Sequence, residues 1–204
     1  GSYYSAIEYV AQNAGAQKNV NLSASSATLI FVNVPGQAQE GLSLLKFGTF
    51  VPNKEGDSGK FRTFFFGSQP KVLAYRLQNN GNVAEHPAGS ILVKDVFGRQ
   101  KMIIKDANPK DSLALIGQTR RFEVCLKSTT KTTKAANGQD ATETICENPG
   151  LFPGRYTAEM QLLYGLNGSP SQQITAKATF WYLPIWFLVT MVVIIAAMAF
   201  GVWR

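Results

Sequence analysis

Few side chains in this sequence could support metal-ion chemistry. The 204-residue chain has one histidine, His86, and two cysteines, Cys125 and Cys146. A zinc site normally uses three or four side-chain ligands, so these residues could build one only if carboxylates joined them. Aspartate and glutamate are scattered along the chain. We therefore expect neither a bound metal nor another cofactor.

The sequence also gives little indication of acid–base or nucleophilic catalysis. His86 could act as a general base beside Glu85, with a serine as the nucleophile. However, the sequence contains no G-x-S-x-G elbow, phosphate-binding loop or dinucleotide fingerprint. The favoured interpretation of His86 is an exposed histidine in a loop. We expect that the protein is not an enzyme.

Cys125 and Cys146 enclose a polar stretch rich in threonine and lysine. A disulfide between them would stabilise the fold by about 3 kcal/mol in the chain-entropy model, and it would suit an extracellular domain. Two reduced thiols are the alternative. The chain has no C-x-x-C spacing, so a redox motif or a zinc knuckle is not indicated.

The apolar run at the C-terminal end of the sequence indicates where the protein lies in a cell. Ile185–Trp203 contains no charged residue, and Thr190 is its only clearly polar side chain. As a helix it would extend about 28 Å, close to the hydrocarbon thickness of a bilayer. The sequence therefore predicts one transmembrane helix within residues 183–204. A buried core helix is the disfavoured alternative.

The flanks of this run carry residue types that are typical of a membrane interface. Trp181, Tyr182 and Trp186 lie at one end, and Trp203 and Arg204 lie at the other. Arg204 suits the cytoplasmic side, and a disulfide would place the preceding domain outside. We expect a single-pass protein of the cell membrane with an extracellular N-terminal domain.

Small residues in the predicted helix could allow another helix to approach closely. They are Ala196, Ala197, Ala199 and Gly201, together with Thr190. We take Ala197 and Gly201 as the candidate helix-packing positions.

The chain is basic, with 20 Lys and Arg against 13 Asp and Glu and a formal net charge of +7. This excess could attract an anionic cell-wall polymer, lipid headgroups or nucleic acid. The basic residues are dispersed, and no aromatic–basic motif of a nucleic-acid module is present. A solvated surface is the favoured interpretation, and we expect no nucleic-acid partner.

Alternating apolar residues and regular turn signals recur from residue 21 onward. Residues 155–164 show the cleanest alternation, and the Asn-Asn-Gly-Asn run at 79–82 is a strong turn signal. The pattern predicts an all-β protein with an antiparallel β-sandwich over residues 21–182. We interpret residues 1–20 as a separate N-terminal segment, the end of a preceding element. Residues 6–12 fit either a helical turn or a strand.

Residues 150–156, GLFPGRY, are similar to the approach to a tyrosine corner. In that motif, a tyrosine hydroxyl near a strand start bonds back to the upstream backbone. A core tyrosine with a hydrated hydroxyl fits Tyr156 equally well.

Several motifs together resemble one family. They are LQNNGNV at 77–83, PAGSILVKDVFG at 87–98, LIGQTRRF at 115–122, FPGRY at 152–156 and the Phe-Trp pair at 180–181. The pattern resembles the immunoglobulin-like extracellular domains of membrane-anchored, Gram-positive-type bacterial surface proteins, including WxL-interacting and peptidoglycan-binding ones. The resemblance covers roughly residues 21–182. The stretch between the cysteines looks like an insertion.

The resemblance implies a fold and a location, but no binding residues. We expect a non-catalytic structural or interaction subunit of a membrane-embedded or surface assembly. Its partners would be the lipid bilayer and other membrane or surface proteins, including copies of itself. The alternative is a surface module that binds an anionic cell-wall polymer, peptidoglycan or a protein of a partner cell.

Overall fold

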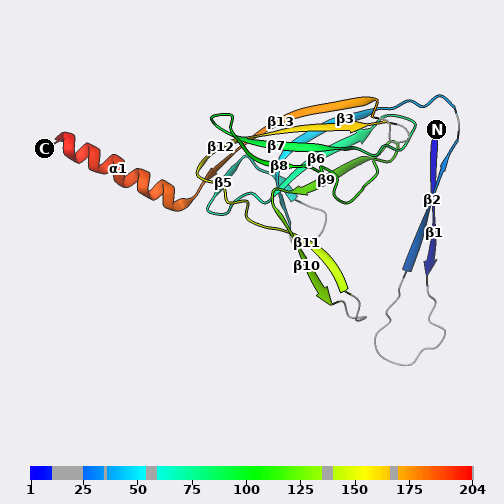
Figure 1. The fold of residues 1–204 in the computed structure, drawn as a ribbon, viewed down its shortest axis with the longest axis horizontal. Coiled ribbons are helices and arrows are strands. Elements are labelled where there is room, and N and C mark those ends of the chain that lie inside the picture. The colour runs from blue at the N-terminus through cyan, green and yellow to red at the C-terminus, as the bar shows by residue number, and fades with distance from the viewer. Residues whose placement is uncertain (11–24, 35, 54–58, 135–139, 166–169, 204) are drawn as a thin grey trace.

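Two β-sheets pack face to face, two β-hairpins project from them, and one helix ends the chain (Figure 1). The computed structural model describes all residues except 11–24, 35, 54–58, 135–139, 166–169 and 204. The prediction of an all-β domain followed by one C-terminal helix is confirmed.

The larger sheet has the order β5–β13–β12–β7–β8. Its strands are β5 (Phe64–Phe66), β13 (Gln172–Leu183), β12 (Gly154–Tyr164), β7 (Ala88–Asp95) and β8 (Gln100–Ile104). All neighbours are antiparallel except β5, which runs parallel to the end of β13.

The smaller sheet has the order β4–β3–β6–β9 and is antiparallel. Its strands are β4 (Gly59–Phe61), β3 (Leu42–Pro52), β6 (Val72–Asn79) and β9 (Thr119–Cys125). Strands β3–β6–β9 and β13–β12–β7–β8 match the A-B-E and G-F-C-C′ arrangements of immunoglobulin domains in order and direction.

The core lies between the two sheets and follows the alternation of β12. Tyr156, Met160 and Leu162 of that strand are buried, while Glu159 and Gln161 lie on the opposite face. From the other sheet, Leu73, Tyr75, Leu77, Phe122 and Val124 join the same buried cluster.

The first hairpin joins β1 (Ser2–Val10) to β2 (Ser25–Asn33) in a two-stranded sheet of its own. Residues 6–10 are therefore strand, and residues 11 and 12 lie outside the described part. Residues 25–33 were expected in the sandwich, and this prediction is wrong, because they pair with β1 outside both large sheets. Alternation identifies a strand, but it does not reveal which strand pairs with it.

The second hairpin joins β10 (Ser128–Lys134) to β11 (Asp140–Cys146). The sequence suggested only a polar insertion here. Threonine favours extended backbone because its side chain is β-branched, which suits two strands facing solvent.

Candidate functional site

Helix α1 (Ile185–Trp203) occupies the predicted residues and begins after Pro184, which alone separates it from β13. It is long and apolar enough to span a membrane, and none of its residues is buried against the rest of the described chain. The hydroxyl of Thr190 donates to the carbonyl of Phe187 at 2.8 Å. The most polar side chain of the helix is thus bonded internally, as a hydrocarbon environment requires.

The predicted interfacial tryptophans border the start of α1. The Trp181 ring is partly exposed and stacks on Phe64, with ring centroids 6.4 Å apart. Trp186 is exposed and meets Phe187 edge-on at 5.9 Å. These side chains are free to face lipid headgroups.

Tyr182 was predicted to lie at the membrane interface, and this prediction is wrong. It is buried in the sandwich core, because successive residues of β13 point to opposite faces and Trp181 takes the outer one. Trp203, at the far end of α1, is exposed. Arg204 lies outside the described residues.

The candidate packing positions Ala197 and Gly201 are exposed. A Cβ atom added at Gly201 would meet nothing within 4 Å in the described chain. The surface around Gly201 is therefore open, and contact with another helix stays a prediction.

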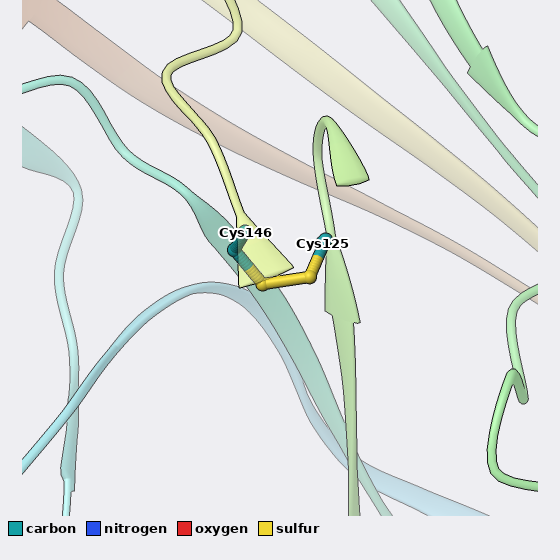
Figure 2. Close-up of a disulfide and its surroundings, with 2 residues drawn as sticks. All are labelled: Cys125 and Cys146. Atoms are coloured by element: carbon teal, nitrogen blue, oxygen red, sulfur yellow. A yellow bond between two sulfur atoms is a disulfide. The ribbon is translucent and has the colours of Figure 1, made fainter. Parts of the chain in front are cut away.

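Cys125 and Cys146 are joined as a disulfide, with their Cα atoms 5.1 Å apart (Figure 2). Cys125 ends β9 and Cys146 ends β11. Beside them, the backbone N–H of Glu147 donates to the carbonyl of Lys127 at 2.9 Å. The disulfide therefore ties the base of the β10–β11 hairpin to the sandwich.

Tyr156 makes the tyrosine corner. Its hydroxyl donates to the carbonyl of Phe152 at 2.8 Å, and its ring is buried. This geometry decides between the two alternatives from the sequence, in favour of the corner. The bond fixes the backbone just before β12, next to the end of β13.

At the opposite end of the sandwich, the turn after β6 depends on the buried side chain of Asn79. Its Nδ2 donates to the carbonyls of Val83 and Ala114, at 2.7 and 2.8 Å. Its Oδ1 accepts from the N–H of Gly81 at 2.9 Å. The buried amide of Asn79 thus links the predicted turn to the loop that contains Ala114.

Glu85 is a buried carboxyl that the sequence did not reveal. No side chain within the described residues hydrogen-bonds its carboxyl oxygens, and the backbone N–H of Gly165 only partly favours the ionised form. Burial, together with the charge of Glu40, raises the pKa of Glu85 to about 7. Only the fold could disclose this, because an acidic residue in a turn is ordinarily solvated.

His86, the next residue, contacts an aspartate of another loop. Its Nε2 lies 2.5 Å from Oδ1 of Asp111, and both side chains are substantially exposed. The arrangement is a side-chain hydrogen bond at the surface between two loops.

Part of the surface charge is neutralised locally. Glu159 contacts Lys94 at 2.6 Å and Lys177 at 2.8 Å, on the outer face of the larger sheet. Hydrogen bonds from Lys177 and Lys94 lower the pKa of Glu159 to about 2. The excess of positive charge on this face is therefore smaller than the count of lysines suggests.

A groove of about 520 Å³ runs between the edges of the two sheets. Lys46, Arg62 and Phe64 line it together with Phe61, whose ring lies 4.7 Å from Nζ of Lys46. The combination of cations and aromatic rings could hold an anionic or sugar-containing ligand.

Within the described residues, no group of three or more His, Cys, Asp or Glu side chains is placed to hold a metal ion. No protein-family model matches the chain, and no curated protein matches it significantly.

Proposed function

We propose that this chain is a non-catalytic, single-pass protein of the cell membrane and an interaction subunit of a larger surface or membrane assembly. Its β domain lies outside the cell, anchored by α1. The disulfide supports this orientation, because such bonds persist in oxidising compartments.

The observation that carries the interaction role is the apolar face of the β1–β2 hairpin. Directly opposed residues of an antiparallel pair share one face. This face carries Tyr3, Ile7, Tyr9, Ile30 and Val32, with exposed fractions between 42% and 66%. We call these five residues the hairpin face.

Such a face is costly in water. An isolated two-stranded hairpin is marginally stable, and a contiguous exposed apolar patch marks an interaction site. The base of the hairpin is held by the sandwich, where the N–H of Ser2 donates to the carbonyl of Asn82 at 2.9 Å. A protein partner at the cell surface, or another copy of the chain, would complete the missing layer.

Particle mass tests this role. We expect the full chain, extracted from its native membrane in mild detergent, to elute as a particle larger than a monomer. Ile7→Ser combined with Tyr9→Ser should reduce that mass. Glu8→Ser, which changes the opposite face of the same strand, should leave it unchanged. A wild-type monomer would contradict the subunit role.

Orientation is tested separately. Protease added to intact cells should remove the β domain and leave a membrane-bound stub that contains α1. Protection until the cells are lysed would reverse the proposed topology.

The groove beside Phe61 favours a second candidate function, the binding of an anionic cell-wall polymer or peptidoglycan. If that is the role, Lys46→Gln with Arg62→Gln should weaken sedimentation with purified cell-wall material. Lys110→Gln, an exposed charge elsewhere on the sandwich, should not. Equal binding by all variants would eliminate this groove as the site.

A further inference from the structure

Three phenylalanines project from separate segments of the sandwich. Phe66 ends β5, Phe97 lies in the turn between β7 and β8, and Phe152 precedes β12. Their exposed fractions are 59%, 77% and 76%. We call these three residues the phenylalanine tips.

The strand register places all three tips at the end of the sandwich from which α1 leaves. Phe66 lies opposite Leu183, the last residue of β13. Gly154, two residues after Phe152, lies opposite Tyr182. The β7–β8 turn follows Asp95, which lies opposite Tyr156 at the start of β12. Figure 1 shows these segments gathered beside the start of α1.

Specific bonds hold the tips outward. In the β7–β8 turn, Oδ1 of Asp95 accepts from the N–H groups of Phe97 and Arg99, at 2.9 Å each. The Tyr156 hydroxyl fixes the carbonyl of Phe152, and Phe66 is paired within the sheet. The exposure of these rings is therefore built into the fold.

Cationic side chains lie near the phenylalanine tips, as is common for residues at the boundary of a bilayer. The Arg99 guanidinium lies 5.0 Å from the centroid of the Phe97 ring. Lys71 and Arg155 are exposed at the same end. Aromatic rings with neighbouring cations favour the headgroup region, where the rings enter the acyl boundary and the cations meet phosphates.

The opposite end of the sandwich differs. Its loops expose the polar residues Asn80, Lys110 and Asp111. Within the described part of the sandwich, the exposed phenylalanines thus lie at the end from which α1 leaves, whereas the exposed tyrosines near the opposite end belong to the β1–β2 hairpin.

We propose that the phenylalanine tips insert into the headgroup and acyl boundary of the same membrane that α1 spans. The inference rests on the proposed membrane anchoring. The linker is the physical reason for choosing lipid as the occupant: Pro184 alone separates β13 from α1, so this end of the sandwich is held against the bilayer surface. The domain would then rest on the membrane through three loop contacts in addition to its helix.

Environment-sensitive labels test this arrangement. Phe97→Cys, Phe152→Cys and Lys110→Cys each add one free thiol for a fluorophore while the native disulfide stays intact. The labelled full chain is reconstituted into vesicles of phosphatidylcholine and phosphatidylglycerol. Labels at 97 and 152 should be blue-shifted, quenched by lipids with a shallow nitroxide and protected from aqueous iodide. The label at 110 should show the reverse.

Two outcomes separate this inference from the anchoring on which it rests. If the chain floats with the vesicles but labels at 97 and 152 are quenched by iodide as strongly as the label at 110, the tips do not insert. If the chain does not float with the vesicles, the anchoring itself fails and the inference falls with it.

A second measurement asks whether the tips act together. A label at Phe66→Cys should lose its protection from iodide when Phe97→Ser and Phe152→Ser are added. Ile103→Ser removes an exposed apolar side chain near the end of β8 that lies away from the β7–β8 turn, so it serves as the matched control and should leave the protection unchanged. Equal protection in both backgrounds would overturn insertion through a shared surface.

Discussion

At the end of the sandwich from which α1 leaves, the Cys125–Cys146 disulfide and the Tyr156 hydroxyl tie segments together, whereas at the opposite end buried side-chain amides link the loops. At that opposite end, Asn108 adds a second amide, which bonds the carbonyls of Pro87 and Ser112. We therefore expect the two ends of this domain to respond to different conditions, one to reductant and the other to pH. The end near the helix contains the disulfide, which reductant would open, and the far end contains buried polar groups, among them the Glu85 carboxyl, whose pKa is raised by burial.

The largest expected effect lies at the far end. Asn79→Ala should lower the free energy of unfolding by about 4 kcal/mol, because two buried backbone carbonyls and one partly buried N–H lose their partner and a cavity is left. Urea unfolding of the full chain in detergent would measure it. Asn80→Ala removes an exposed bond to Ser43 and should cost about 0.5 kcal/mol. Similar losses in both variants would mean that the buried amide has no special role.

At the end near the helix, Cys125→Ser with Cys146→Ser should cost about 3 kcal/mol, because the unfolded chain regains the entropy of the closed loop. Thermal unfolding with and without reductant would show this. Reductant should destabilise the wild type and leave the double variant unchanged. Freely alkylated cysteines in the native protein would contradict both the disulfide and the proposed topology.

The pH dependence of folding stability should report on the far end of the sandwich, where Glu85 is buried. The folded-state pKa of Glu85 lies above its ordinary value of 4.5, at about 7, because the carboxyl is buried. Folding therefore favours the protonated form, and stability should fall by about 2 kcal/mol between pH 5 and pH 8. Glu85→Gln should flatten this fall and make the protein more stable at pH 8. An unchanged slope in the variant would show that Glu85 is not the titrating group.

Glu159 serves as a control, because its pKa is shifted in the opposite direction to that of Glu85. Its folded-state pKa is lowered to about 2 by Lys177 and Lys94, so its contribution is complete above pH 4.5 and is lost as the pH falls toward 2. Glu159→Gln should therefore be less stable than the wild type by a constant amount above pH 4.5, and it should lack the fall in stability between pH 4.5 and 2.

The smallest effect expected is that of the tyrosine corner. Tyr156→Phe should cost about 1 kcal/mol, the usual net value of a buried neutral hydrogen bond. Tyr3→Phe, at an exposed position of the hairpin face, should leave the unfolding midpoint unchanged. A silent Tyr156→Phe would show that the corner does not contribute to closing this end.

Elements with a strong local period could be predicted from the sequence. The bounds of α1 and the alternation of β12 agree with the expectation, because an apolar run and a period of two are properties of single segments. The disulfide was predicted from the number and setting of the cysteines, and the tyrosine corner was one of two alternatives.

What escaped prediction depends on contacts between distant segments. The pairing of β2 with β1, the inward orientation of Tyr182 and the burial of Glu85 are set by neighbours that no local pattern names. The β10–β11 hairpin escaped because both of its strands are polar, so no apolar alternation marks them.

The direct junction of β13 with α1 also determines how the domain would carry mechanical force. A pull on α1 would enter β13 at Leu183, along the direction of the strand. Antiparallel hydrogen bonds lie perpendicular to the strands, so this pull shears the whole ladder from Gly154–Tyr182 to Tyr164–Gln172 at once. Strand β5 shares the load on the other side, over the last three residues of β13. The anchor is thereby attached in the direction in which a sheet resists extension best.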